Sequence, residues 1–205
     1  MKNIVLFASQ GNNVGKSSTA KNLSELLAET TDLYSFADPI RDHCNTLFEF
    51  EYKVKSGKFT DYYSNRSLKN KNIYDTIKDE SANPKLTKYT FRTFINDMSD
   101  EYQKLKGKDV WAKMAVDFIQ TSSAKVILID DFRRDVEGNF LIENLNPEEF
   151  NLIFVFLIKE DIKDQVDSSY EGLLKDFSFD ITFNINSDYS NMPELYEIIT
   201  SKLKD

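Results

Sequence analysis

Continuously apolar runs alternate along this chain with segments of helical periodicity. Residues 4–8, 126–129 and 152–158 are uninterrupted apolar runs, which are typical of strands buried on both faces of a parallel sheet. Residues 33–37 form another predicted strand, and the weaker alternation of residues 181–185 predicts an edge strand. Strands that alternate with helices predict an α/β fold with a parallel sheet of about five strands and right-handed crossovers.

Apolar positions at helical spacing predict the helices between these strands. Leu26 and Leu105 belong to two of the apolar stripes. Gly107 interrupts the pattern, and Asp109 is placed to cap the helix that follows. The predicted helices span residues 17–29, 40–50, 91–105, 110–119 and 193–203.

Residues 51–86 differ from the rest of the chain. Lys, Asn, Ser, Asp and Tyr dominate there, and Pro84 lies near the end. This composition predicts an irregular, exposed insertion or lid-like segment. We expect a second, lid-like segment around residues 159–179. A length of 205 residues fits one domain, residues 1–205, that carries both segments.

Composition excludes several classes of function. A net charge of −8 and a pI near 4.8 disfavour broad binding to nucleic acid or to anionic membranes. No apolar run approaches the ~20 residues of a membrane span, and residues 4–8 are too few for a signal peptide. One cysteine, Cys44, and one histidine, His43, exclude an intramolecular disulfide, a histidine-based metal site and a serine–histidine triad. We therefore expect a cytoplasmic protein.

The first predicted strand leads into the first predicted helix through Ser-Gln-Gly-Asn-Asn-Val-Gly-Lys-Ser-Ser, residues 9–18. In a phosphate-binding loop, inward-turned backbone N–H groups and the helix N-terminus hold the phosphates of ATP. Gly15 permits close approach, Lys16 neutralises the β- and γ-phosphates, and Ser17 offers a hydroxyl to Mg²⁺. The predicted nucleotide-binding residues are Gly11, Asn12, Asn13, Val14, Gly15, Lys16, Ser17 and Ser18.

One position departs from the usual phosphate-loop pattern. Gln10 stands where that pattern has glycine, and Gly11 follows it. The alternative is a strand–helix turn with a chance Gly-Lys-Ser sequence.

A pair of carboxylates and a set of arginines are candidates for the rest of the site. Asp130 and Asp131 directly follow the strand at residues 126–129, so Asp131 is placed to hold Mg²⁺ through water at the carboxyl end of the sheet. Only five of the 26 basic residues are arginine. A phosphate acceptor needs bidentate cations rather than a catalytic base. The candidates for this role are Arg41, Arg92, Arg133 and Arg134.

Short segments outside the phosphate loop carry a family resemblance. They are Ser-Phe-Ala-Asp-Pro-Ile-Arg at residues 35–41, Phe91-Arg92, Lys108-Asp109-Val110-Trp111, Asp131-Phe132-Arg133 with Glu137, Ser169-Tyr170-Glu171, and residues 180–186. Together with the phosphate loop, these segments resemble the deoxynucleoside monophosphate kinases of bacteriophages, a branch of the P-loop nucleotide kinases.

The resemblance implies a P-loop NTPase fold with strand order 2-3-1-4-5. It implies transfer of the γ-phosphoryl group of ATP to a (deoxy)nucleoside monophosphate with Mg²⁺, in a homodimer in the cytoplasm of a host cell. Lys16 and Ser17 would bind ATP and Mg²⁺, and Asp131 would order the metal shell. Arg92 and Arg133, with Arg41, would hold the acceptor. Trp111 would stack on the acceptor base, unless it belongs to the core.

Other functions remain open on the same sequence. A kinase with a hydroxyl acceptor would use a carboxylate base, and Asp38 can serve. A nucleotide-dependent ATPase or switch is another alternative, although partitioning ATPases carry a signature lysine where this chain has Gly11. A degenerate kinase fold kept as a binding module would account for Gln10 and for the lack of arginine in residues 159–179.

Overall fold

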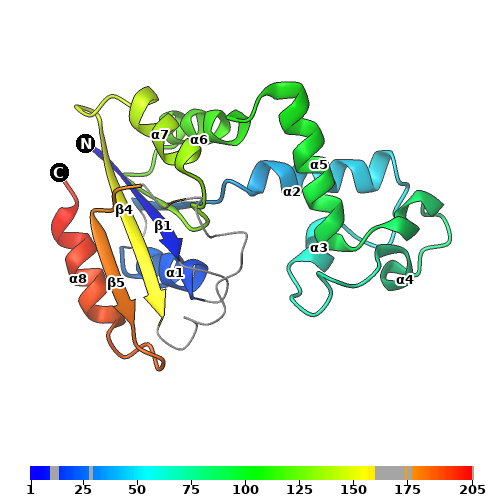
Figure 1. The fold of residues 1–205 in the computed structure, drawn as a ribbon, viewed down its shortest axis with the longest axis horizontal. Coiled ribbons are helices and arrows are strands. Elements are labelled where there is room, and N and C mark those ends of the chain that lie inside the picture. The colour runs from blue at the N-terminus through cyan, green and yellow to red at the C-terminus, as the bar shows by residue number, and fades with distance from the viewer. Residues whose placement is uncertain (10–13, 28–29, 160–173, 175–176, 205) are drawn as a thin grey trace. The chain divides into compact units, whose positions relative to one another are not determined.

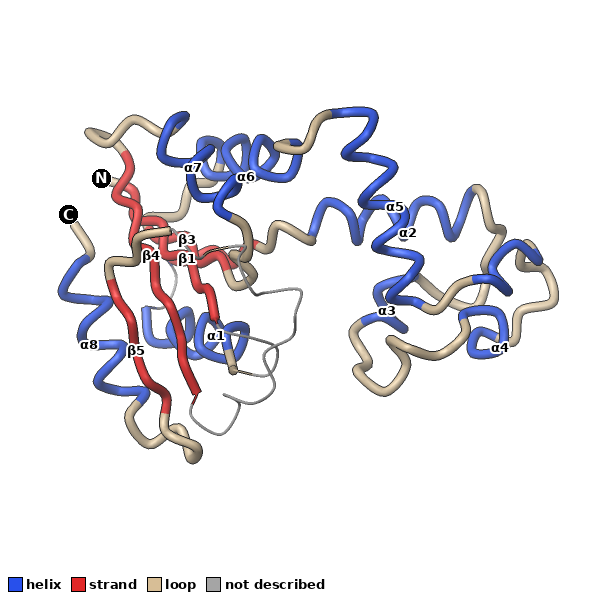
Figure 2. Tube along the Cα trace, viewed as in Figure 1, coloured by secondary structure: helices blue, strands red, loops and turns tan. Residues whose placement is uncertain are grey.

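The computed structural model describes residues 1–9, 14–27, 30–159, 174 and 177–204 (Figure 1). The chain divides into two compact units. One consists of Met1–Phe36 and Trp111–Asp205 and is called the sheet unit below; the other is Ala37–Val110, the helical unit. Figure 2 shows that the strands belong to the first and that the second is built of helices and loops.

Within the described residues, the sheet unit contains a parallel sheet of five strands in the order β2-β3-β1-β4-β5. This confirms the α/β fold, the five parallel strands and the expected strand order. β5 lies at an edge, as its weaker alternation predicted. The strands are β1 (Lys2–Ser9), β2 (Thr31–Tyr34), β3 (Val126–Ile129), β4 (Phe150–Lys159) and β5 (Ile181–Ile185).

Helices bury both faces of this sheet, which is why its central strands are apolar throughout. Val5 and Phe7 of β1 belong to a core cluster with Leu23 of α1 and Leu195 of α8. The intervening β1 residues point to the opposite face and are equally buried. α6 and α7 lie on the other side of the sheet from α8 (Figure 1). The helices of this unit are α1 (Lys16–Leu27), α6 (Val110–Thr121), α7 (Asp135–Asn144) and α8 (Met192–Lys202).

Strand β2 differs from its prediction. We expected residues 33–37, but the strand ends at Tyr34. The Ser35 hydroxyl and the Phe36 N–H instead donate to the carboxylate of Asp131, which follows β3. The hydrogen bonds to Asp131 therefore end β2 earlier than the apolar residues Phe36 and Ala37 predict.

The polar stretch at residues 51–86 is mostly irregular and exposed, as its composition predicted, but it also contains three short helices that were not predicted. It lies inside the helical unit and contains α3 (Phe59–Tyr63), α4 (Ile73–Ile77) and the 3-10 helix η2 (Pro84–Lys88). These short helices pack with α2 (Asp38–Phe50) and α5 (Phe91–Lys106). Their few apolar residues are buried in an aromatic core in which Phe48 contacts Phe59, Phe91 and Phe94. A few widely spaced buried apolar residues are therefore enough to fold this polar segment.

Two smaller predictions about helices were wrong. Leu26 and Leu105 are 66% and 81% exposed, although both continue an apolar stripe. Each lies near the last turn of its helix, where the packing partner has already diverged. Helix α7 was not predicted, because its polar first turn and Gly138 obscure the helical pattern.

No helix in the described part of the chain is both long enough and apolar enough to cross a membrane.

The aromatic core of the helical unit allows a test with two nearby phenylalanines. Phe48 is 1% exposed and Phe50 is 64% exposed on the same helix. We expect Phe48→Ala to lower the free energy of unfolding by about 3–5 kcal/mol, and Phe50→Ala to change it by less than about 0.5 kcal/mol. Urea unfolding followed by circular dichroism measures both. Similar losses for the two variants would contradict this packing.

Candidate functional site

The candidate site is built around the turn between β1 and α1. β1 ends at Ser9 and α1 begins at Lys16. Val14, just before the helix, is 1% exposed and belongs to the core cluster, so the end of the turn is anchored. Gly11, Asn12 and Asn13, with Gln10, lie outside the described residues, so their predicted role stays a prediction.

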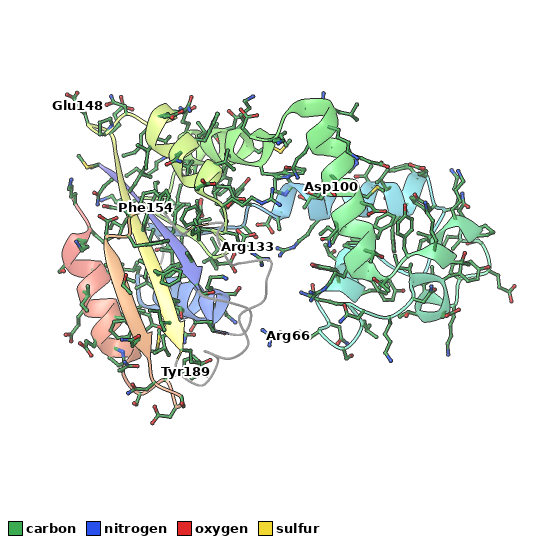
Figure 3. The ribbon with its side chains drawn as sticks, viewed as in Figure 1. Arg66, Asp100, Arg133, Glu148, Phe154 and Tyr189 are labelled. Carbon is green, nitrogen blue, oxygen red and sulfur yellow. The ribbon has the colours of Figure 1, made fainter. Side chains whose placement is uncertain are left out.

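Gly15 has a backbone conformation that only glycine adopts without strain. Its φ is +104°, and a Cβ built on it would lie 3.0 Å from Cε1 of Tyr189. Tyr189 lies on the turn between β5 and α8, beyond the carboxyl ends of β4 and β5 (Figure 3). The Lys159 amine lies 4.1 Å from the centroid of its ring. Gly15 is thus needed both for the turn and for the close approach of this aromatic ring.

Lys16 is a buried cation held beside the turn. It is 9% exposed, and its amine donates a hydrogen bond of 2.8 Å to the Ser9 hydroxyl. Burial, and to a lesser extent the charge of Arg133, lower its pKa from 10.5 to about 8, while the carboxylates of Asp131 and Asp130 oppose this shift. Charged groups that follow β3 therefore act on Lys16.

Asp131 joins the carboxyl ends of two neighbouring strands. One of its oxygens accepts a 2.6 Å hydrogen bond from the Ser35 hydroxyl, and the other accepts a 2.7 Å bond from the Phe36 N–H. The side chain is 9% exposed and close enough to Lys16 to raise its pKa. Because both oxygens already accept from the protein, Asp131 suits a place in the outer shell of a metal, reached through water, as predicted.

Ser17 and Ser18 are exposed on the first turn of α1. That turn carries no acidic residue, so the positive end of the helix dipole is not neutralised there. In the described residues, no three His, Cys, Asp or Glu side chains come together as a metal site. Mg²⁺ usually keeps several waters and takes ligands from substrate phosphates, so it needs no such cluster. The serine hydroxyl and the nearby carboxylates fit this ion.

The predicted arginines are divided between the two units. Arg133 is exposed on the connection between β3 and α7, in the sheet unit (Figure 3). Arg41 and Arg92 belong to the helical unit. Arg41 forms a 2.7 Å ion pair with Asp38, and Arg92 is exposed on the first turn of α5.

Trp111 is the second residue of α6 and is 6% exposed. Its burial favours a place in the core over the predicted stacking on an acceptor base.

Several residues of the site had no assigned role in the sequence. Ser9 and Ser35 are partners of predicted residues, and nothing in a single serine distinguishes it from others. Tyr189 lies far along the chain from Gly15, and only the fold brings them together. Glu137 formed part of the family resemblance, without a function.

A cavity of about 750 Å³ lies at the other end of the strands, with Lys2, Leu27, Lys125 and Glu149 among its lining residues. None of the predicted site residues lines it. In open parallel sheets, ligands bind beyond the carboxyl ends of the strands. We therefore place the candidate site at the turn around Lys16.

Comparison of the sequence with protein-family models found no match, and comparison with curated proteins found none either.

The close contact at Gly15 generates the first prediction for this site. Gly15→Ala should destabilise the protein by at least about 1–2 kcal/mol, because alanine is strained at a positive φ and its methyl group meets Tyr189. Adding Tyr189→Ala should relieve the clash but leave the backbone strain. Urea unfolding of the single and double variants separates the two effects. A Gly15→Ala protein as stable as the wild type would contradict this geometry.

Lys16 generates a prediction about stability and pH. Because its folded pKa is below its unfolded pKa, the charged form opposes folding below pH 8, and the penalty fades as the pH rises from about 8 to 10.5. Lys16→Met should therefore be more stable than the wild type at pH 7. A gain on the order of 1 kcal/mol raises Tm by about 2–4 °C.

The advantage of Lys16→Met should shrink between pH 8 and pH 10, as thermal unfolding would show. Lys21→Met is the matched control, since the side chain of Lys21 is 71% exposed on the same helix. A less stable Lys16→Met protein at pH 7 would mean that the buried charge is better compensated than its surroundings indicate.

Proposed function

We propose that this chain is an ATP-dependent phosphotransferase whose acceptor is a (deoxy)nucleoside monophosphate. The observation that supports it most is the buried amine of Lys16, which begins α1 directly after the positive-φ residue Gly15 and donates to the Ser9 hydroxyl. Burying an ammonium group costs free energy, and a bound anion offsets part of that cost. A polyphosphate at a helix N-terminus is an anion of the right kind.

In this proposal, phosphoryl transfer depends on positioning and on neutralisation of charge. Lys16 binds the β- and γ-phosphates, and releases its hydrogen bond to Ser9 as it does so. Arg133 stabilises the charge that spreads over the transferred group. Ser17 would hold Mg²⁺ directly and Asp131 through water, and the ion would supply additional positive charge. Arg41 and Arg92, which the family resemblance assigns to the acceptor phosphate, belong to the other unit.

One observation favours a phosphate acceptor over a hydroxyl acceptor. A hydroxyl acceptor needs a base, for which Asp38 is the candidate. The Asp38 carboxylate is already paired with Arg41 at 2.7 Å and must give up this ion pair to take a proton. A monophosphate acceptor needs no base, and the other N–H groups of the Arg41 guanidinium can donate to it while the ion pair persists.

The experiment is an ADP-release assay with Mg·ATP and a panel of nucleoside and deoxynucleoside monophosphates. We expect acceptor-dependent ADP release that Lys16→Ala abolishes and that Lys21→Ala leaves within about twofold. Release with a nucleoside but not with its monophosphate would establish the hydroxyl-acceptor kinase. ATP binding without release for any acceptor would establish a binding module, and release without an acceptor an ATPase.

Arg133 is assigned by a separate measurement. Arg133→Ala should lower kcat/KM for the monophosphate at least about tenfold while changing the Kd of ATP much less. Lys21→Ala, a change at an exposed cation with no assigned role, serves as the control. Equal losses in ATP binding and acceptor use would mean that Arg133 serves the donor nucleotide instead.

A further inference from the structure

Glu137 is a buried carboxylate that holds the backbone of the candidate arginine. It lies in the first turn of α7 and is 8% exposed. Its Oε2 atom accepts two hydrogen bonds of 3.1 Å, from the N–H groups of Arg133 and Arg134. An acidic residue at the third helical position commonly accepts from the N-cap, which here is Arg134. The bond from Arg133 reaches one residue further, outside the helix.

Helix capping alone does not account for the burial of this charge. Asp61 occupies the same position in α3 and accepts from the N–H of the N-cap Lys58 at 2.8 Å, yet it is exposed to solvent. Glu137 makes the same kind of bond at a greater cost. Burial first, and then the neighbouring Asp131, raise its pKa from 4.5 to about 7. An arrangement that keeps two carboxylates near each other in the interior calls for a role beyond helix formation.

The role follows from what fixes the chain on either side of Arg133. Asp131 is bonded to Ser35 and Phe36, as described above. Phe132 is 1% exposed and packs against Phe154 and Phe177. Glu137 fixes the following peptides. Arg133 is therefore an exposed side chain on a segment that is anchored both before and after it.

We propose that Glu137 is a positioning residue that sets the direction of the exposed Arg133 side chain by fixing the backbone of residues 133 and 134. The inference rests on the proposed function, since Arg133 is assigned there to the transferred group. Without Glu137, the peptides of Arg133 and Arg134 lose their acceptor, and the guanidinium samples directions away from the phosphates. Positioning errors of this kind reduce the rate of transfer without removing any group that contacts the substrate.

Kinetics provide the first test. Glu137→Ala should reproduce Arg133→Ala, with kcat/KM for the monophosphate lowered about tenfold and the Kd of ATP within about twofold. The two substitutions should be non-additive when combined, because both remove the same interaction. Glu137→Gln should recover most of the loss, since its amide oxygen accepts the same two N–H groups. Glu143→Ala, at an exposed position of α7, is the control for the helix.

A spectroscopic test separates this inference from the proposed function. Reductive ¹³C-methylation makes the amine of Lys16 visible by NMR, and Lys16→Met assigns its signal. Arg133 lowers the pKa of Lys16, so Arg133→Ala should raise it, and Glu137→Ala should raise it as well. Loss of the Glu137 charge by itself would not raise this pKa, because removing an anion can only lower the pKa of an ammonium group. The sign of the shift therefore identifies the cause.

The outcomes are distinct. If no monophosphate supports ADP release, the proposed function fails, and a raised pKa of Lys16 in Glu137→Ala still supports the positioning of Arg133. An unchanged or lowered pKa, or a Glu137→Ala enzyme that loses stability but keeps wild-type kinetics, overturns the positioning role. Should Glu137→Ala not fold, Glu137→Asp keeps the charge and withdraws the acceptor by one methylene group, and the same readouts apply.

Discussion

The candidate site depends on one constraint: the amine of Lys16 is buried, although burial disfavours its charged form. The charge of Arg133 adds to this effect. The fold tolerates this arrangement because Val14 anchors the turn in the core and Gly15 adopts a conformation closed to other residues. Keeping Lys16 charged in the unliganded protein costs free energy, and an anion that binds there would offset this cost. The proposed affinity for phosphate therefore has the same origin as the destabilisation by Lys16.

The second constraint is a link between strand ends. Asp131 takes its hydrogen bonds from Ser35 and Phe36, so the ends of β2 and β3 are joined by a side chain where the sheet's own ladder stops. The charge of Asp131 raises the pKa of both Lys16 and Glu137. A change at Asp131 would therefore affect the start of α1 and the start of α7 together.

The sequence predicted those parts of the fold in which local pattern and burial agree. The uninterrupted apolar runs of β1, β3 and β4 could be recognised because helices cover both faces of the sheet, and the strand order came from the family resemblance. The end of β2 could not be predicted, since a distant carboxylate determines it. The short helices within residues 51–86 were not predicted, because the apolar residues that they bury are few and widely spaced. In the site, the residue types of Lys16, Asp131 and Arg133 pointed to their chemistry, whereas Tyr189 and the burial of Glu137 depend on tertiary packing.

The position of β1 in the sheet has a consequence for how the chain folds. β1 is synthesised first and lies at the centre, where its partners β3 and β4 come from the second half of the chain. The side chains of Asn3 and Asn151, which share a hydrogen bond, are 148 positions apart. Contacts this distant must overcome a large loop-closure entropy, which slows folding. The contacts of the helical unit close shorter loops, such as the one between Phe48 and Phe94, and all its residues precede β3 in the chain. Its early formation would shorten the effective loop that β1 has to close.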